Sequence, residues 1–167
     1  MSRSICLKEV MLIAVIILFG LSNLAVAGEA QQIDSCSLLT KDEIKAAFGQ
    51  EVTDGKANTA ANPMVGAPCQ YKIGSYGSFS ILIKPAAPGE TADNVKAELQ
   101  KRKIPVSKAA DIGDRSFFSS PGYGMVQLNT FKGSHYLIIT TLVMGATEAA
   151  QQTACEKLMR TALTKIK

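Results

Sequence analysis

The sequence has no tryptophan and a single histidine, and aromatic residues make up only 6% of its 167 residues. With so few rings, a nucleic-acid groove built on stacked aromatic side chains is not expected. The formal net charge of +4 is mild and demands no nucleic-acid partner. The lone histidine and the absence of a Cys-x-x-Cys pair leave no spacing typical of a zinc site or a redox-active dithiol. The sequence therefore predicts no catalytic set, no metal site and no cofactor.

Only one long apolar run occurs, and it lies at the start of the chain. A basic start precedes residues 10–21, which are almost wholly apolar, and the small-residue stretch Ala25-Val26-Ala27 follows. This order is typical of a secretory signal peptide. We therefore expect residues 1–27 to be cleaved near Ala27, leaving a periplasmic or extracellular protein. An uncleaved anchor is the alternative, because residues 10–27 are just long enough to span a bilayer.

The rest of the chain has the size of one domain. We expect residues 28–35 to be a flexible N-terminus and residues 36–167 to form a single α+β domain. A chain of this size buries roughly two-thirds of its unfolded surface, which is enough for a core without many cross-links. We expect contact with a membrane only through the signal segment, before it is cleaved.

Three cysteines remain after the leader, an odd number for an exported chain: Cys36, Cys69 and Cys155. Three pairings could each form a single bridge. Cys155 lies at helical spacing from Leu158 and Met159, so we place it on a buried helix face, where a free thiol behaves as a small hydrophobic group. Cys36 and Cys69 flank regular elements near polar turns, and we favour a disulfide bond between them.

Local patterns predict three helices. The first begins at Thr40, where Glu43 three residues later completes a capping box, and it ends at Gly49. The second is expected over residues 91–103, and the third over residues 147–165.

Six strands are predicted from apolar runs between turn residues. They cover residues 51–56, Cys69–Ile73, 78–84, 115–119, 125–131 and 135–144. From Tyr136 onward the last strand is apolar or threonine throughout, so we expect it in the middle of a sheet with both faces covered. The resulting order, α-β-β-β-α-β-β-β-α, favours a mainly antiparallel sheet with packed helices, an α+β fold.

Several short motifs carry a resemblance that covers most of residues 34–167. They are Cys36-Ser37-Leu38-Leu39-Thr40-Lys41-Asp42-Glu43-Ile44 with Gly49, then Cys69-Gln70-Tyr71, then Ile112-Gly113-Asp114-Arg115-Ser116-Phe117-Phe118, and the Lys132-Gly133 turn. The chain resembles a family of small exported bacterial proteins of unknown function, which is loosely similar to α/β/α sandwiches of the Mog1/PsbP type. The resemblance implies export, this fold class and the Cys36–Cys69 bridge, and it supplies no catalytic residue.

Candidate site residues are few. His135 lies at a turn–strand junction. The sequence shows no candidate nucleophile or orienting acid for it, so a surface histidine is the simpler interpretation. Phe117 and Phe118 are neighbours on a strand and must point to opposite faces, so one enters the core and the other needs a covering helix or a partner. With Tyr123 and Arg115 they form the binding surface that we predict. Burial of both phenyl rings is the alternative.

A basic group, formed by Lys101, Arg102, Lys103 and Lys108, is suited to contact anionic lipid or cell-wall polymer, although a solvated helix end explains it more simply. The function that fits best is a non-enzymatic binding or accessory domain of the cell envelope. Its expected partner is an envelope protein or a small apolar ligand. One alternative is a carrier of an apolar molecule or lipid in a pocket between the sheet and the terminal helix. Another is an envelope hydrolase or redox accessory with a site that the sequence does not reveal.

Overall fold

The computed structural model describes residues 33–60 and 66–166. The predicted signal peptide and most of the predicted flexible segment, residues 28–35, lie outside these ranges. The described part of that segment is packed, because Ile33 contacts the core and Ser35 is buried. The Ile83 N–H donates a hydrogen bond to Ser35 Oγ at 3.3 Å. The folded domain therefore begins before Cys36, which corrects the expected boundary.

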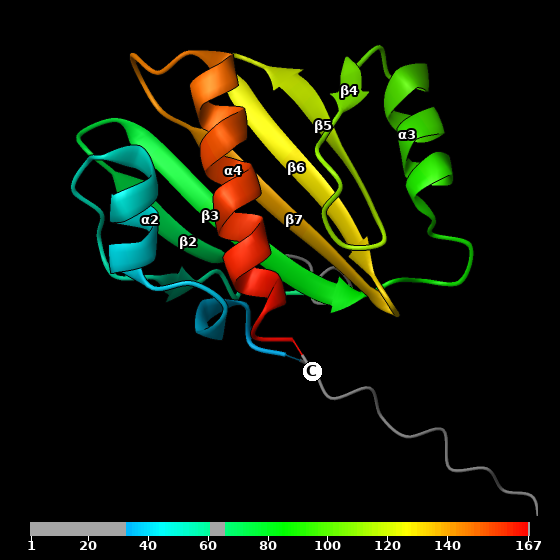
Figure 1. The fold of residues 1–167 in the computed structure, drawn as a ribbon, viewed down its shortest axis with the longest axis horizontal. Helices are drawn as coiled ribbons and strands as arrows, with labels where there is room; N and C mark the ends of the chain where they lie inside the picture. The colour runs from blue at the N-terminus through cyan, green and yellow to red at the C-terminus, as the bar shows by residue number, and fades with distance from the viewer. Residues whose placement is uncertain (1–32, 61–65, 167) are drawn as a thin grey trace, which may run out of the picture. The chain divides into compact units, whose positions relative to one another are not determined.

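The described residues form three α-helices and one short 3-10 turn (Figure 1). They are η1 (Ser35–Ser37), α2 (Lys41–Phe48), α3 (Ala92–Lys101) and α4 (Glu148–Leu163). Each α-helix begins after a threonine whose hydroxyl accepts a backbone N–H of the first turn, namely Thr40, Thr91 or Thr147. No helix in these ranges is both long enough and apolar enough to cross a bilayer.

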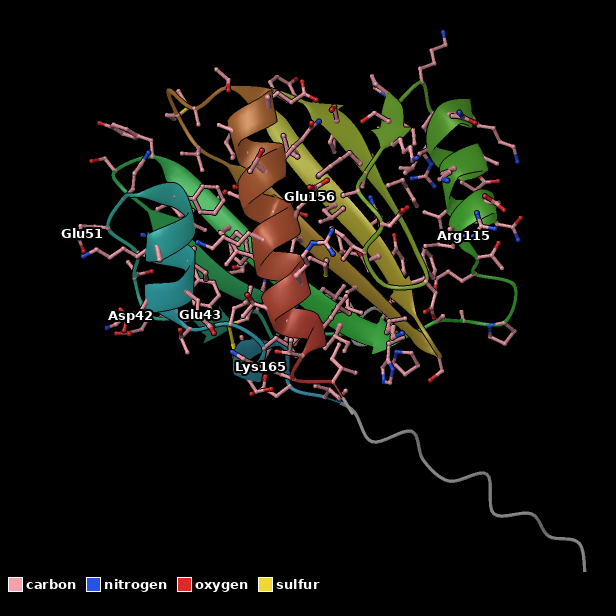
Figure 2. The ribbon with its side chains drawn as sticks, viewed as in Figure 1. Asp42, Glu43, Glu51, Arg115, Glu156 and Lys165 are labelled. Carbon is pink, nitrogen blue, oxygen red and sulfur yellow. A yellow bond between two sulfur atoms is a disulfide. The ribbon has the colours of Figure 1, made fainter. Side chains whose placement is uncertain are left out.

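The predicted start of α2 is confirmed in detail. The Thr40 N–H donates to Glu43 Oε2 at 2.8 Å, while the Glu43 N–H donates to Thr40 Oγ1. Gly49 ends the helix with a φ of 67°, a left-handed conformation that glycine adopts without strain. The same Glu43 carboxylate lies 3.0 Å from Lys165 Nζ, which ties α2 to the end of α4 (Figure 2).

The described strands form one antiparallel sheet in the order β1-β2-β3-β7-β6-β5-β4. They are β1 (Lys56–Ala57), β2 (Cys69–Ile73), β3 (Gly77–Pro85), β4 (Val106–Lys108), β5 (Arg115–Gly122), β6 (Met125–Lys132) and β7 (His135–Leu142). The predicted α+β class and element order are confirmed, and β7 is central as expected. The structure adds β4 at one edge, a three-residue strand too short to show a periodic pattern.

The first predicted strand, residues 51–56, is interrupted. Val52 makes an isolated bridge to Ile73, and regular pairing with β2 resumes only at Lys56. Between these points the edge bends closely around β2. A Cβ added to Gly55 would lie 2.6 Å from Cζ of Tyr71, so this approach requires glycine.

Helices cover the two faces of the sheet unequally. α2 and α4 lie on one face, in front of the sheet in Figure 1, and enclose the main core. α3 packs at the β4–β5–β6 side, where it encloses a second, smaller core with Phe117, Phe131 and Tyr136. The second face of β2, β3 and β7 is less covered, and we call it the open face. Both faces of β7 were expected to be covered, but its Thr140 and Leu142 are only half-buried there, which corrects that expectation.

The favoured Cys36–Cys69 disulfide bond is present and joins η1 to β2 across 33 residues. Cys155 is a free thiol on α4 and is fully buried, as its helical spacing predicted. Burial, with a smaller contribution from Glu156, raises the pKa of this thiol well above its usual range. Cys155 is therefore protonated and packs as an apolar group.

Candidate functional site

The four residues of the predicted binding surface do not form one surface. Phe117 is buried in the second core, with Lys96 Nζ 5.2 Å from its ring centre, and Phe118 is buried in the main core on the other face. Alternation along β5 thus buries both rings, the alternative given with the prediction. Tyr123 is exposed at the β5–β6 turn, and Arg115 is exposed at the opposite end of β5 (Figure 2).

The histidine and the free thiol of the described residues lie in different surroundings. His135 is half-buried at the start of β7, paired across the sheet with Lys132 and Pro85. Cys155 is enclosed in the main core without exposed area, so it offers no thiolate to an imidazole at the rim. In residues 33–60 and 66–166, no three His, Cys, Asp or Glu side chains gather in a way that could hold a metal ion.

The space under the terminal helix, where a carrier would hold its cargo, is filled. Ala154, Cys155, Leu158, Met159 and Ala162 of α4 are buried against the sheet. A hollow of about 460 Å³ lies elsewhere, at the open face next to the β1 edge. We take this hollow as the candidate site.

Strand alternation explains why most of the residues that line the hollow are hydrophilic. In β2 and β3 every second side chain enters the main core, including Tyr71, Ile73 and Phe79, so the residues between them face the other way. Those residues are hydrophilic, and with the bent edge they supply most of the lining: Gln70, Lys72, Ser78 and Ser80, together with Thr53, Asp54 and Lys56, and Thr140 from β7. Tyr71 and Phe79 complete the lining and add apolar surface to it. Farther along β3, Gly66 lies against Leu82, and neither residue lines the hollow.

The register of the sheet aligns six polar side chains, four of which line the hollow, across six neighbouring strands. From β1 to β5, successive pairing partners are Lys56, Gln70, Ser80, Thr140, Gln127 and Ser119. We call this set the polar row. Neighbouring strands lie about 4.8 Å apart, so the row is roughly 24 Å long. It runs from the solvent-exposed edge to the region covered by α3.

Hydrogen bonds fix the inner part of the polar row. Ser119 Oγ donates to Gln127 Oε1 at 3.1 Å, and Gln127 Nε2 donates to Thr140 Oγ1 at 3.2 Å. Asn129 Nδ2 in turn donates to Ser119 Oγ, and the Tyr136 hydroxyl donates to Asn129 Oδ1 at 2.6 Å. Burial, followed by the charge of Glu90, raises the pKa of Tyr136, so this phenol remains a donor. These hydrogen bonds fix the side chain of Thr140, the member of the network that also lines the hollow.

The acidic side chain beside the hollow is paired with a lysine, whereas two lysines beside it are in no ion pair among the described residues. The Asp54 carboxylate lies 2.8 Å from Lys41 Nζ, whose hydrogen bond and charge lower the pKa of Asp54, so its negative charge is matched from α2. Within the described residues, neither Lys56 nor Lys72 belongs to an ion pair. The hollow thus combines positive charge at its rim with hydroxyl and amide groups on its floor.

Sequence reasoning missed this site. Glutamine, lysine and serine at alternate positions of two strands indicate an ordinary solvated face, and they carry no recognisable motif. The alignment with Thr140 and Gln127 depends on which strands pair and in which register, and no local pattern contains that information.

No family model matches the sequence, and no solved structure matches the fold. The interpretation of the hollow therefore rests on its own geometry and chemistry.

Proposed function

We propose that the protein is an exported, non-enzymatic binding domain of the cell envelope and that the open face binds its ligand. One observation carries this proposal: the polar row brings hydrogen-bonding side chains from six strands into one line, and its four outer members line a hollow. Binding sites combine a concave shape with a few well-positioned polar groups, and the network behind Thr140 supplies such positioning.

Export is part of the proposal. The Cys36–Cys69 bond is consistent with an oxidising compartment, because disulfide bonds seldom persist in a reducing cytosol. The leader pattern of residues 1–27 and the resemblance to small exported bacterial proteins support the same location.

The lining favours a polar, anionic ligand over the small apolar molecule expected from the sequence. Lys56 and Lys72 supply positive charge, while Gln70, Ser80 and Thr140 supply donors and acceptors. An apolar ligand would cover these groups without pairing them, which is unfavourable. A ligand with a carboxylate or phosphate and several hydroxyl groups, such as an acidic oligosaccharide, would satisfy them.

An NMR titration of the exported protein tests the site, with trigalacturonate as an acidic probe and maltotriose as a neutral one. We expect trigalacturonate to shift the backbone amides of Gln70, Ser80 and Thr140, and maltotriose to act more weakly. Lys72→Gln should weaken trigalacturonate binding, whereas Arg115→Gln, outside the hollow, should leave it unchanged. Shifts confined to another face, or no shift at millimolar probe, would overturn the proposed site. Cleavage of the probe would favour the hydrolase alternative.

Mass spectrometry of the same material tests export and processing. We expect an N-terminus near Gly28, one disulfide bond, one free thiol, and any co-purified ligand to be polar. An intact protein that retains residues 1–27 would contradict cleavage while leaving the titration result valid.

A further inference from the structure

Three exposed apolar side chains stand at one end of the sheet. Among the described residues, the exposed large hydrophobic side chains are Tyr76, Tyr123 and Met144, with exposed fractions of 84%, 95% and 63%. Tyr76 lies in the β2–β3 turn, Tyr123 in the β5–β6 turn, and Met144 two residues after the end of β7. Antiparallel pairing places the end of β7 beside the starts of β3 and β6, so all three share one end of the sheet, the upper left side in Figure 1. We call this end the tip.

The tip also holds unusual backbone. In the described ranges, the non-glycine residues with positive φ are Lys103, at 59°, and Tyr123, at 55°. Lys103 lies in the loop that leads from α3 to β4, and this loop reaches the end of β5, where the Ser120 N–H donates to Pro105 O at 3.1 Å. Residues other than glycine and asparagine are disfavoured in this backbone conformation. Those that adopt it cluster at binding surfaces. Tyr123 and Lys103 are thus exposed side chains at positions where glycine would adopt the backbone conformation with less strain.

A buried glutamine holds two of the tip's turns in place. Gln151 of α4 is buried, its Oε1 accepts the Val143 N–H at 3.1 Å, and its Nε2 donates to Gly124 O at 3.3 Å. Val143 precedes Met144, and Gly124 follows Tyr123. Tyr123 and Met144 are therefore each one residue from a hydrogen-bonded anchor, which reduces the entropy that binding must remove.

Positive charge accompanies these side chains at the tip. The end of α3 carries Lys101, Arg102 and Lys103, all exposed. Glu98 pairs with Lys101 at 2.6 Å, and Glu148 accepts the Ser120 hydroxyl. Arg102 and Lys103 belong to no ion pair within the described residues. Their charge is available to an anionic partner.

We propose that the tip docks on an anionic lipid surface, with Tyr76, Tyr123 and Met144 at the level of the headgroups and Arg102 and Lys103 facing lipid phosphates. Tyrosine concentrates at membrane–water interfaces because its ring is apolar and its hydroxyl is polar, and cations near an anionic leaflet are attracted to it.

The shape of the tip favours this partner over a folded protein. A hollow of about 360 Å³ lies between the β5–β6 turn and α4, yet none of the three exposed side chains lines it. They project from separate turns, which suits a deformable headgroup layer better than a rigid complementary surface. The contact is separate from the open face, and it departs from the expectation that the chain meets a membrane only through its leader.

The absence of tryptophan makes a direct test possible. Tyr123→Trp places one reporter at the tip, and Arg115→Trp places one at the other end of β5. With vesicles of phosphatidylethanolamine and phosphatidylglycerol (3:1), we expect the emission of Tyr123→Trp to shift to shorter wavelength and to be quenched by brominated lipid. Arg115→Trp should not respond, and phosphatidylcholine vesicles should give neither effect.

Co-sedimentation with the same vesicles measures the contribution of each group. Tyr76→Ser with Tyr123→Asn should lower the partition coefficient at least fivefold, since asparagine accepts a positive φ and the turn is kept. Arg102→Gln should weaken binding, and Arg115→Gln is its matched control for net charge. All variants are purified from the exported fraction with the same N-terminus, so any contribution of the leader cancels.

Three results would overturn the proposal. One is an unchanged partition coefficient after both tyrosine substitutions. Another is an equal loss for Arg102→Gln and Arg115→Gln, which would indicate a general charge effect. The third is an emission shift of Tyr123→Trp that depends on protein concentration without lipid, which would identify a second copy of the chain as the partner.

Discussion

Thr140 and Thr141 are consecutive residues of β7 whose hydroxyl groups have opposite surroundings. Thr140 Oγ1, on the open face, accepts a hydrogen bond from Gln127 Nε2 at 3.2 Å. Thr141 Oγ1 is buried on the face under α4 and has no hydrogen-bond partner within the described residues. A buried polar group without a partner costs about 1–3 kcal/mol. Neighbouring hydroxyls of one strand thus differ in what they contribute to stability.

Replacing each threonine by valine, which has nearly the same shape, should therefore change stability in opposite directions. Thr141→Val should raise the free energy of unfolding by about 1 kcal/mol, because it removes an unpaired buried hydroxyl. Thr140→Val should lower it by about 1 kcal/mol, because it leaves the Gln127 amide without its acceptor. Urea denaturation monitored by circular dichroism measures both. A loss of stability in Thr141→Val would contradict the assignment of its hydroxyl as unpaired.

The disulfide bond gives a second prediction. It closes a loop between residues 33 positions apart in sequence, and it fixes η1 against β2. Chain-entropy arguments assign such a loop roughly 3–4 kcal/mol. The double variant Cys36→Ala, Cys69→Ala should therefore lose a large part of the protein's stability, seen as a lower urea midpoint. A midpoint equal to that of the unsubstituted protein would show that the bridge contributes nothing beyond packing.

The reactivity of Cys155 follows from its burial. Since burial raises the pKa of this thiol, very little thiolate exists at neutral pH, and no path leads a reagent to it in the folded state. Iodoacetamide should leave the native exported protein unmodified and add one group after unfolding in urea. Rapid labelling of the native protein at Cys155 would contradict the packed core. A second alkylated cysteine after unfolding would be Cys6, and it would indicate that the leader is retained.

The sequence reveals those parts of this fold that local chemistry determines. The start of α2 could be predicted because Thr40 and Glu43 satisfy each other's backbone groups whatever surrounds them. Cys155 could be placed in the core because its neighbours repeat at helical spacing. The central position of β7 followed from its continuous apolar character.

The candidate sites could not be predicted in the same way, because they depend on which strands pair. Gln70 and Gln127 are far apart in the sequence, and only the pairing of β2, β3, β7 and β6 aligns them. Phe117 and Phe118 were predicted at a binding surface, since local alternation does not show that α3 covers one of the two faces. Tyr123 remains exposed because glycines on both sides keep it in a tight turn.

Gln151 offers a further test of how the tip is held. Gln151→Met removes both anchors, the bond from Val143 N–H and the bond to Gly124 O, while it keeps the size of the side chain. We expect a loss of about 1–3 kcal/mol and faster hydrogen exchange at Val143. Gln152→Met is the matched control, since Gln152 is the next residue of the helix and its amide reaches only Glu148. Equal effects of the two variants would contradict the anchoring role.

Glu43 makes the stability of the domain depend on pH in a defined direction. Burial alone would raise its pKa, but the hydrogen bonds from the Thr40 backbone and from Lys165 outweigh burial and lower it. Because the folded pKa lies below the unfolded value of about 4.3, the ionised carboxylate stabilises the fold at neutral pH. That contribution is lost as the pH falls through the folded pKa.

Glu43→Gln isolates this effect, because glutamine keeps the capping-box geometry and removes only the charge. We expect the variant to be less stable than the unsubstituted protein at pH 7 and the difference to shrink below about pH 4, where Glu43 itself becomes neutral. Asp42→Asn, one residue earlier in the same exposed turn, controls for the loss of one negative charge near the helix start. Urea denaturation at a series of pH values measures all three proteins. A difference between Glu43→Gln and the unsubstituted protein that stays constant from pH 7 to pH 3 would show that Lys165 and Thr40 do not favour the ionised carboxylate.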